Sequence, residues 1–229
     1  MNANSMKLHL KDSIMQTRTA TVTTSVLLIT GAILANVAFI GLGSVFHYPD
    51  ILQESTDEIF RQFSAHQGII SFWFVLLALG AGMLAPIAIL LKRQFSERLS
   101  RLTMWVGITA AIVQVVGLLR WPLLVPGLVT TKNVEAFEFL HTFLGTIVGE
   151  TLGYLFTGLW TILVSKSLGR HFTGMWFTYL GYIAAGLILL GVLLPLGLSG
   201  ADMANFIGYV LWSIWLILFA VVLLRRHSQ

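Results

Sequence analysis

The chain contains six long apolar stretches, and its basic residues are distributed unevenly between them. A helix needs about 20 mainly apolar residues to cross a membrane, and each stretch has that length. Eleven of the fourteen Lys and Arg lie in the N-terminal segment, the second gap, the fourth gap and the C-terminus. Only Arg61, Arg120 and Lys132 lie elsewhere. Because cytoplasmic loops are enriched in Lys and Arg, this alternation predicts six membrane crossings with both termini in the cytoplasm.

We therefore expect an all-α polytopic membrane protein, a six-transmembrane-helix bundle. Residues 1–20 and 226–229 are expected as cytoplasmic tails and residues 21–225 as one membrane domain. The six helices are expected at about 22–45, 68–91, 103–125, 137–164, 176–198 and 204–224. The first stretch is too long for a signal-peptide core and lacks a small-residue cleavage site. It is therefore interpreted as a retained helix in a bacterial inner membrane.

Composition excludes several other classes of protein. The residues are 56% hydrophobic and 10% charged, and neither polar segment is long enough to bury a core of its own. The net charge of +4 comes from the cytoplasmic loops, so the expected partner is the lipid bilayer and not a nucleic acid. The absence of cysteine excludes thiolate metal sites and thioether-linked haem.

The connection between the first two stretches shows helical periodicity. Leu52, Ile59 and Phe63 fall on one face of a helix, and acidic residues lie between them. This pattern predicts a short amphipathic helix on the outer surface, serving either as a membrane-surface helix or as an ordered connector.

Polar side chains inside the bilayer are the candidate functional residues, because each charged one costs about 2.5–3.5 kcal/mol on the insertion scale. At 1.5 Å per residue, His141 lies about 3 Å and Glu150 about 17 Å below the outer edge. On the preceding helix, Arg120 reaches about 25 Å and Gln114 about 17 Å above the inner edge. The candidates for binding a ligand or a proton are Arg120, Glu138, His141, Glu150, Gln114 and Asn36. Depth pairs Arg120 with Glu138 and His141, and Gln114 with Glu150.

Small residues recur every four positions in the fourth stretch. The stripe consists of His141, Gly145, Gly149, Gly153, Thr157 and Thr161. Glycines at this spacing let a second helix approach closely. We therefore expect a helix–helix partner to pack against Gly145, Gly149 and Gly153.

Three interpretations of the polar residues stay open. In the first, Arg120 and Glu138 form an interfacial ion pair and Glu150 is a neutral, hydrogen-bonded core acid, so that the protein is a non-catalytic partner or scaffold. In the second, an outward-facing polar site binds or transports a small solute or protons through Glu150.

The third interpretation is a metal- or haem-binding redox protein that uses His66 and His141. Glu138-x-x-His141 matches half of a di-iron motif, but such bundles need two of these units. No cofactor is predicted. The chain has no Ser-centred nucleophile motif and no HExxH, so a role without catalysis is favoured over an intramembrane enzyme with Glu150 or His141 as its base.

Several short sequence motifs resemble one family of membrane proteins. They are Tyr48-Pro-Asp-Ile-Leu52, Gly117-Leu-Leu-Arg-Trp121 with Val125-Pro126, Leu140-His141, Gly149-Glu150, Gly153-Tyr154 and Leu159-Trp160-Thr161. Together they resemble bacterial membrane proteins grouped as domain of unknown function 4386. The resemblance implies a six-helix integral membrane protein, implies no particular chemistry, and falls on Arg120, His141 and Glu150.

Overall fold

The computed structural model describes residues 3–227, with side chains for 18–169, 172 and 174–226, and within these residues it is entirely helical. Six helical stretches are long and apolar enough to cross a membrane, as predicted. They are Arg18–Phe46, Thr56–Gln94, Arg101–Thr131, Val134–Gly169, Met175–Leu196 and Ala201–Arg226. Several are built from more than one helical element. The elements are α1 (Ala3–Phe46), η1 (Asp50–Gln53), α2 (Thr56–Gly82), α3 (Leu84–Gln94), α4 (Arg101–Leu123), α5 (Val125–Thr131), α6 (Val134–Leu140), η2 (His141–Leu152), α7 (Gly153–Thr173), α8 (Met175–Leu190), η3 (Gly191–Leu196) and α9 (Ala201–His227).

Ile59 and Phe63 of the predicted surface helix belong to α2, whereas Leu52 lies in the separate short helix η1. Ser55 caps the N-terminus of α2, accepting a hydrogen bond from the Glu58 backbone N–H at 3.4 Å. From there the helix continues into the second span through a kink at His66, where φ is −136° and ψ is 28°. Ile59 and Phe63 are buried against the bundle, which makes this segment a packed extension of the span.

Prolines divide the second and third spans. Pro86 has no N–H to donate to the carbonyl four residues earlier, and α2 gives way to α3 at Met83, one turn before it. Pro122 lies in the last turn of α4, which ends at Leu123. Arg120 therefore lies in the last turn of α4.

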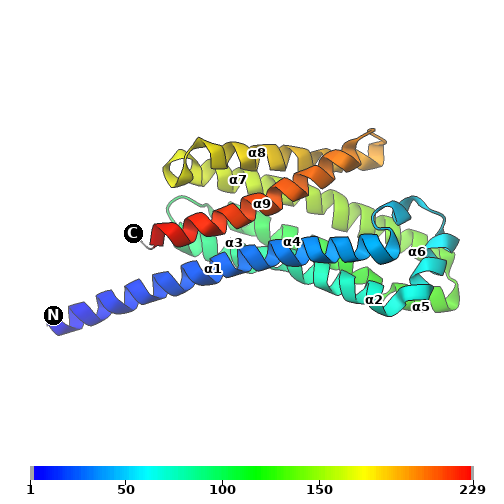
Figure 1. The fold of residues 1–229 in the computed structure, drawn as a ribbon, viewed down its shortest axis with the longest axis horizontal. Helices are drawn as coiled ribbons and strands as arrows, with labels where there is room; N and C mark the ends of the chain where they lie inside the picture. The colour runs from blue at the N-terminus through cyan, green and yellow to red at the C-terminus, as the bar shows by residue number, and fades with distance from the viewer. Residues whose placement is uncertain (1–2, 228–229) are drawn as a thin grey trace.

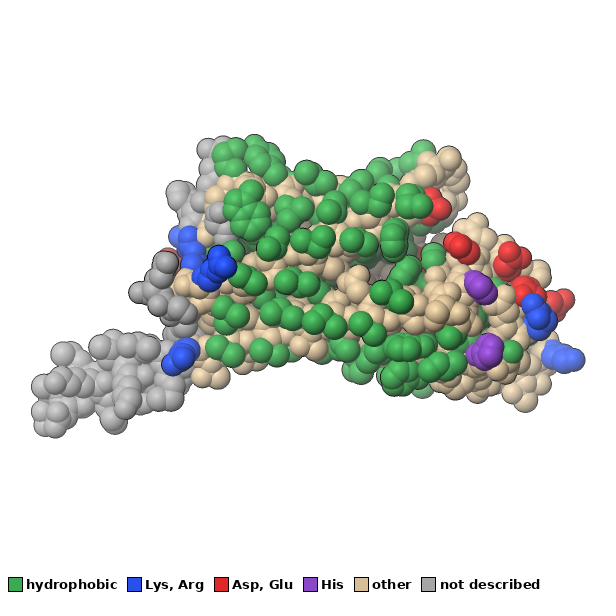
Figure 2. All heavy atoms as spheres, viewed as in Figure 1, with side chains coloured by type: hydrophobic (Ala, Val, Ile, Leu, Met, Phe, Trp, Pro, Cys, Tyr) green, Lys and Arg blue, Asp and Glu red, His purple; other side chains and the backbone are tan. Residues whose placement is uncertain are grey.

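The two ends of the bundle differ in charge. The basic end carries Arg18, Lys92, Arg93, Arg98, Arg101 and Lys166. The acidic end carries Asp50, Glu54, Asp57, Glu58, Glu135 and Glu138. Figure 1 places η1, α5 and α6 together at the acidic end, and Figure 2 shows hydrophobic side chains covering the length between the two ends. This distribution is that of a membrane-spanning bundle.

Two apolar clusters form the interior. Trp160, Phe177, Trp215 and Phe219 belong to the cluster in the half nearer the basic end. Phe46, Phe63, Phe74 and Trp121 belong to the cluster in the half nearer the acidic end, where the Phe74 and Trp121 rings stack 5.0 Å apart. Arg120 and His141 both lie beside Trp121 of this second cluster.

Candidate functional site

Arg120 is a buried cation that forms no salt bridge with any side chain that the structure describes. The residue is only 5% exposed, although it lies in a membrane-spanning helix. Its Nη1 donates to the Gly117 carbonyl at 2.5 Å, and its Cζ lies 5.2 Å from the centroid of the Trp121 ring. Its Nε is buried and makes no hydrogen bond. Across the side chains that the structure describes, the one salt bridge joins Arg61 to Glu58, so the charge of Arg120 is not neutralised by a paired carboxylate.

The predicted ion pair between Arg120 and Glu138 is wrong. Glu138 is exposed on α6, and its carboxylate accepts a hydrogen bond from the Thr56 hydroxyl at 3.1 Å. The two residues were paired by their depth in the membrane. Depth does not define the direction in which a side chain leaves its helix, and Glu138 points toward the start of α2.

The glycine stripe packs against α4 of the same chain. A Cβ on Gly145 would lie 2.6 Å from Arg120 Nη2, and a Cβ on Gly153 would lie 2.8 Å from Gln114 Cγ. A Cβ on Gly149 would lie 2.9 Å from the Cα of Gly117. At Gly149 the neighbour is backbone and cannot yield to a side chain, whereas at Gly145 and Gly153 it is a side chain of α4. The helix next to this stripe is therefore α4.

The segment that carries His141, Gly145 and Glu150 is a π-helix. It runs through the twelve residues of η2, between the α-helical α6 and α7. The π-helix bonds each residue to the fifth one along, is rare, and is found mostly as single turns at functional sites. Sequence reasoning assumed an α-helix here. The four-residue spacing of small residues showed that the segment packs closely, but it did not reveal the wider turn.

Glu150 lies within electrostatic range of Arg120 and of two tyrosines, and no salt bridge or side-chain hydrogen bond joins it to them. Arg120, Glu150, Tyr48 and Tyr154 all interact with one another through their charges or phenols. Burial and the Glu150 carboxylate raise the pKa of Tyr48, which lies between the first two spans, and Arg120 acts in the opposite direction. Glu150 itself is half-buried and makes no side-chain hydrogen bond to any residue whose side chain the structure describes. With His141, which also senses the charge of Arg120, these residues form what we call the polar cluster: Arg120, His141, Glu150, Tyr48 and Tyr154.

His141 packs among aromatic rings at the acidic side of the polar cluster. Its ring lies 5.5 Å from that of Phe137 and 6.4 Å from that of Trp121, measured between centroids. Its Nδ1 is buried without a hydrogen-bond partner. His66, the other predicted metal ligand, is exposed at the kink of α2. Within the described residues no three His, Asp or Glu side chains are grouped as a metal site would require, so these two histidines have no third ligand beside them.

The other predicted polar residues join helices to one another. Gln114 donates to the Thr157 hydroxyl at 3.0 Å, which links α4 to α7 and not to Glu150. Asn36 donates to the Ser213 hydroxyl at 2.8 Å, linking α1 to α9. Neither side chain forms a hydrogen bond to Arg120, His141, Glu150, Tyr48 or Tyr154 among the described residues, so both serve as contacts between helices.

Sequence reasoning missed three residues near the polar cluster. Tyr48 and Tyr154 belong to the cluster itself, and Tyr209 of α9 packs against Tyr154 with ring centroids 5.8 Å apart. The Tyr209 hydroxyl is buried without a hydrogen bond of good geometry. Tyrosine is common at membrane interfaces, so residue type alone gave no signal for a tyrosine that lies in the interior.

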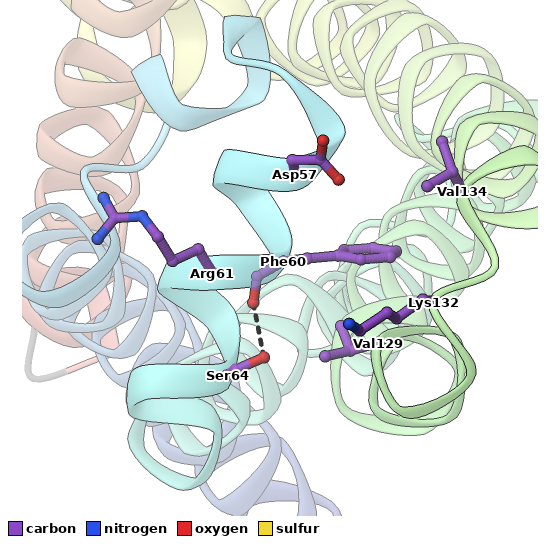
Figure 3. Close-up of a pocket in the computed structure, with 7 residues that line it drawn as sticks. All are labelled: Asp57, Phe60, Arg61, Ser64, Val129, Lys132 and Val134. Atoms are coloured by element: carbon purple, nitrogen blue, oxygen red, sulfur yellow. Dashed lines mark hydrogen bonds between the residues drawn. The ribbon is translucent and has the colours of Figure 1, made fainter.

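A shallow cavity of about 270 Å³ opens at the acidic end of the molecule (Figure 3). Ser64 and Phe60 of α2 lie on one side of it, joined by a hydrogen bond of 2.7 Å from the Ser64 hydroxyl to the Phe60 carbonyl. Its lining consists of Asp57, Phe60, Arg61, Ser64, Val129, Lys132 and Val134. None of the predicted site residues lines it, so it is a surface feature distinct from the polar cluster.

A family model matches the chain over residues 23–220, and its description is Domain of unknown function (DUF4386). The chain belongs to the DUF4386 family. The match includes every residue of the polar cluster and the whole glycine stripe, and it confirms the resemblance found in the sequence. No curated protein and no solved structure matches the chain. Membership in DUF4386 thus fits an integral membrane protein and leaves the chemistry to be argued from the site.

Proposed function

We propose that this DUF4386 protein is a bacterial inner-membrane protein, with both termini in the cytoplasm, that binds a small polar solute and exchanges protons at an outward-facing site. The topology rests on charge. The basic end holds most of the Lys and Arg, as cytoplasmic ends do, and the acidic end then faces outward. Figure 2 also shows the acidic end indented between the α8–α9 turn and the α1–α2 connection, which supports access from that side.

The observation that carries the proposal is the buried, unpaired guanidinium of Arg120. On the insertion scale a charged side chain costs about 2.5–3.5 kcal/mol at the centre of a membrane helix, and Arg120 lies nearer the outer end of its span, in the last turn of α4. Paired charges offset such a cost through their mutual attraction, but Arg120 is 5% exposed and has no salt bridge. An apolar residue would serve packing better at this position. Ionisable residues that face a bundle interior in this way mark solute or proton sites.

Glu150 supplies the group that exchanges protons. It lies within electrostatic reach of Arg120, in the π-helical segment, and its carboxyl group is not held by a side-chain hydrogen bond to the residues described. Two tyrosine hydroxyls lie in the same cluster. A carboxyl group in such surroundings changes its protonation when the charge next to it changes. Binding of a solute at Arg120 would therefore change the affinity of Glu150 for a proton.

Proton exchange is tested in reconstituted vesicles that enclose a pH-sensitive dye. After a step in external pH, the wild-type protein is expected to accelerate the change in internal pH relative to empty vesicles. Glu150→Gln is expected to abolish the acceleration. Glu138→Gln is the matched control, since Glu138 is exposed and bonded to Thr56, and it should behave as the wild type. Equal rates for the wild type and Glu150→Gln would contradict the proposed role of Glu150.

A further inference from the structure

Three neighbouring side chains in the polar region present buried donors with nothing to donate to. Of the seven buried, unpaired side-chain polar atoms among the described residues, one belongs to Arg120 (Nε), one to Trp121 (Nε1) and one to His141 (Nδ1). The Arg120 Cζ lies 5.2 Å from the Trp121 ring, whose centroid is 6.4 Å from that of His141. Leaving a buried donor unpaired costs about 1–3 kcal/mol. Because the three side chains are neighbours, one acceptor among them would satisfy these donors.

The chemistry of these atoms identifies what the acceptor is. Arginine Nε and tryptophan Nε1 only donate hydrogen bonds, and histidine Nδ1 donates in one of its two neutral tautomers. A ligand that satisfies all three must offer several lone pairs and no competing donors. An oxyanion has this character, and the guanidinium fork of arginine fits the two oxygens of a carboxylate.

Charge limits the oxyanion to a single negative charge. Arg120 is the one cation among the three donors, and the Glu150 carboxyl group lies within electrostatic range of it. A doubly charged anion would leave one charge unbalanced in the bilayer and would face the Glu150 carboxylate. A monovalent carboxylate balances Arg120 and leaves Glu150 free to take up a proton.

We propose that Arg120, Trp121 and His141 form the binding site for the carboxylate group of a monovalent organic acid. This assignment rests on the proposed function and names the class of its solute. The three atoms are enclosed by protein, so the acid reaches them when η2 shifts away from α4. The contact between the two elements is made by Gly145 and Gly149, which hold no side chain against α4, and both glycines belong to the π-helical segment η2.

The test uses the full-length protein purified in detergent. Its melting temperature is measured at increasing concentrations of sodium acetate. Separate titrations with sodium chloride and sodium phosphate are made at the same ionic strength. Acetate is expected to raise the melting temperature until binding saturates. Chloride and phosphate are not expected to raise it. Arg120→Gln should weaken acetate binding at least about tenfold, because it removes a hydrogen bond to a charged group. Arg101→Gln, an exposed arginine at the other end of the same helix, should leave it unchanged.

Two further variants keep the test decisive if Arg120→Gln does not fold. Trp121→Phe keeps a ring beside Phe74 but removes the N–H, and His141→Phe keeps a ring against Phe137. Each should weaken acetate binding by roughly three- to tenfold. Trp105→Phe, an exposed tryptophan of α4, is the control without effect. The proposal would be overturned if acetate did not bind, or if phosphate or chloride bound equally well. It would also be overturned if substitutions at Arg120, Trp121 and His141 left acetate binding unchanged.

The source of the acid is resolved by chain length. Decanoate is compared with acetate, and decanol controls for partitioning into detergent. If decanoate binds more tightly than either acetate or decanol, the natural ligand is a fatty acid. If decanoate and acetate bind equally, the natural ligand is a small water-soluble acid. Both outcomes support the carboxylate site. If no carboxylate binds while proton exchange still requires Glu150, this assignment fails and the proposed function stands. If proton exchange does not require Glu150, the proposed function fails whatever acetate does.

Discussion

Gly149 of η2 and Gly117 of α4 meet backbone to backbone: a Cβ built on Gly149 would lie 2.9 Å from the Cα of Gly117. One turn further along α4, Arg120 donates to the Gly117 carbonyl and lies against Gly145. The residue next to Gly149 is Glu150. The glycine contact therefore fixes how far Arg120 and Glu150 lie from each other, and it joins the packing of the bundle to the geometry of the polar cluster.

Alanine at this contact is expected to destabilise the protein. Gly117→Ala and Gly149→Ala each add a methyl group where backbone already fills the space, and such overpacking costs about 1–3 kcal/mol. Both variants should therefore melt at lower temperature in detergent. Gly186→Ala is the control, since nothing lies within 4 Å of a Cβ on this glycine of α8. It should be neutral or stabilising by about 0.5–1 kcal/mol. A loss at Gly186 as large as that at Gly117 would show that the contact is not the cause.

Arg120 is expected to contribute little to stability. Arg120→Met keeps most of the side-chain volume and removes a buried charge that has no salt bridge. Replacing buried charges by apolar side chains is often neutral or stabilising by about 1–4 kcal/mol. We expect the melting temperature to stay the same or to rise, while acetate binding is lost. Phe219→Ala, a fully buried ring of α9, should lower stability by about 3–5 kcal/mol in the same assay. A comparable fall for Arg120→Met would make Arg120 a structural residue.

Six spans could be predicted from the sequence because they depend on the hydrophobicity of local segments. Even so, α2 begins at Thr56 and not near Gly68, because Ile59 and Phe63 pack onto the bundle and continue the helix outward. The cost of burying charge also drew attention to Arg120, which is 5% exposed in the structure. Both predictions use properties of one segment at a time.

The geometry of the site could not be predicted, because it depends on the rotation of one helix against another. Glu138 and His141 are three residues apart, yet Glu138 bonds to Thr56 and His141 packs on Trp121. Gln114 and Glu150 lie at one depth but do not bond to each other, because Gln114 reaches Thr157. The π-helical turn of η2 changes the rotation again. Tyr48 enters the cluster from the connection between two spans, which depth along a helix cannot show.

The topology is expected to place Glu135 outside and Glu97 inside the cell. The chain has no cysteine, so single cysteines report accessibility without background. Glu135→Cys in α6 and Glu97→Cys between α3 and α4 are both exposed positions. In intact bacteria or spheroplasts, a membrane-impermeant maleimide should label Glu135→Cys at once and Glu97→Cys only after permeabilisation. The reverse pattern would place both termini outside.

The protonation of Glu150 can be observed directly by infrared difference spectroscopy on the protein in reconstituted membranes. Spectra are recorded at two values of external pH, with and without sodium acetate. We predict a carboxyl band that changes with pH, shifts when acetate is added, disappears in Glu150→Gln and persists in Glu138→Gln. A spectrum of Glu150→Gln identical to that of the wild type would show that Glu150 does not exchange protons with the outer side, and would contradict an outward-facing polar site centred on this residue.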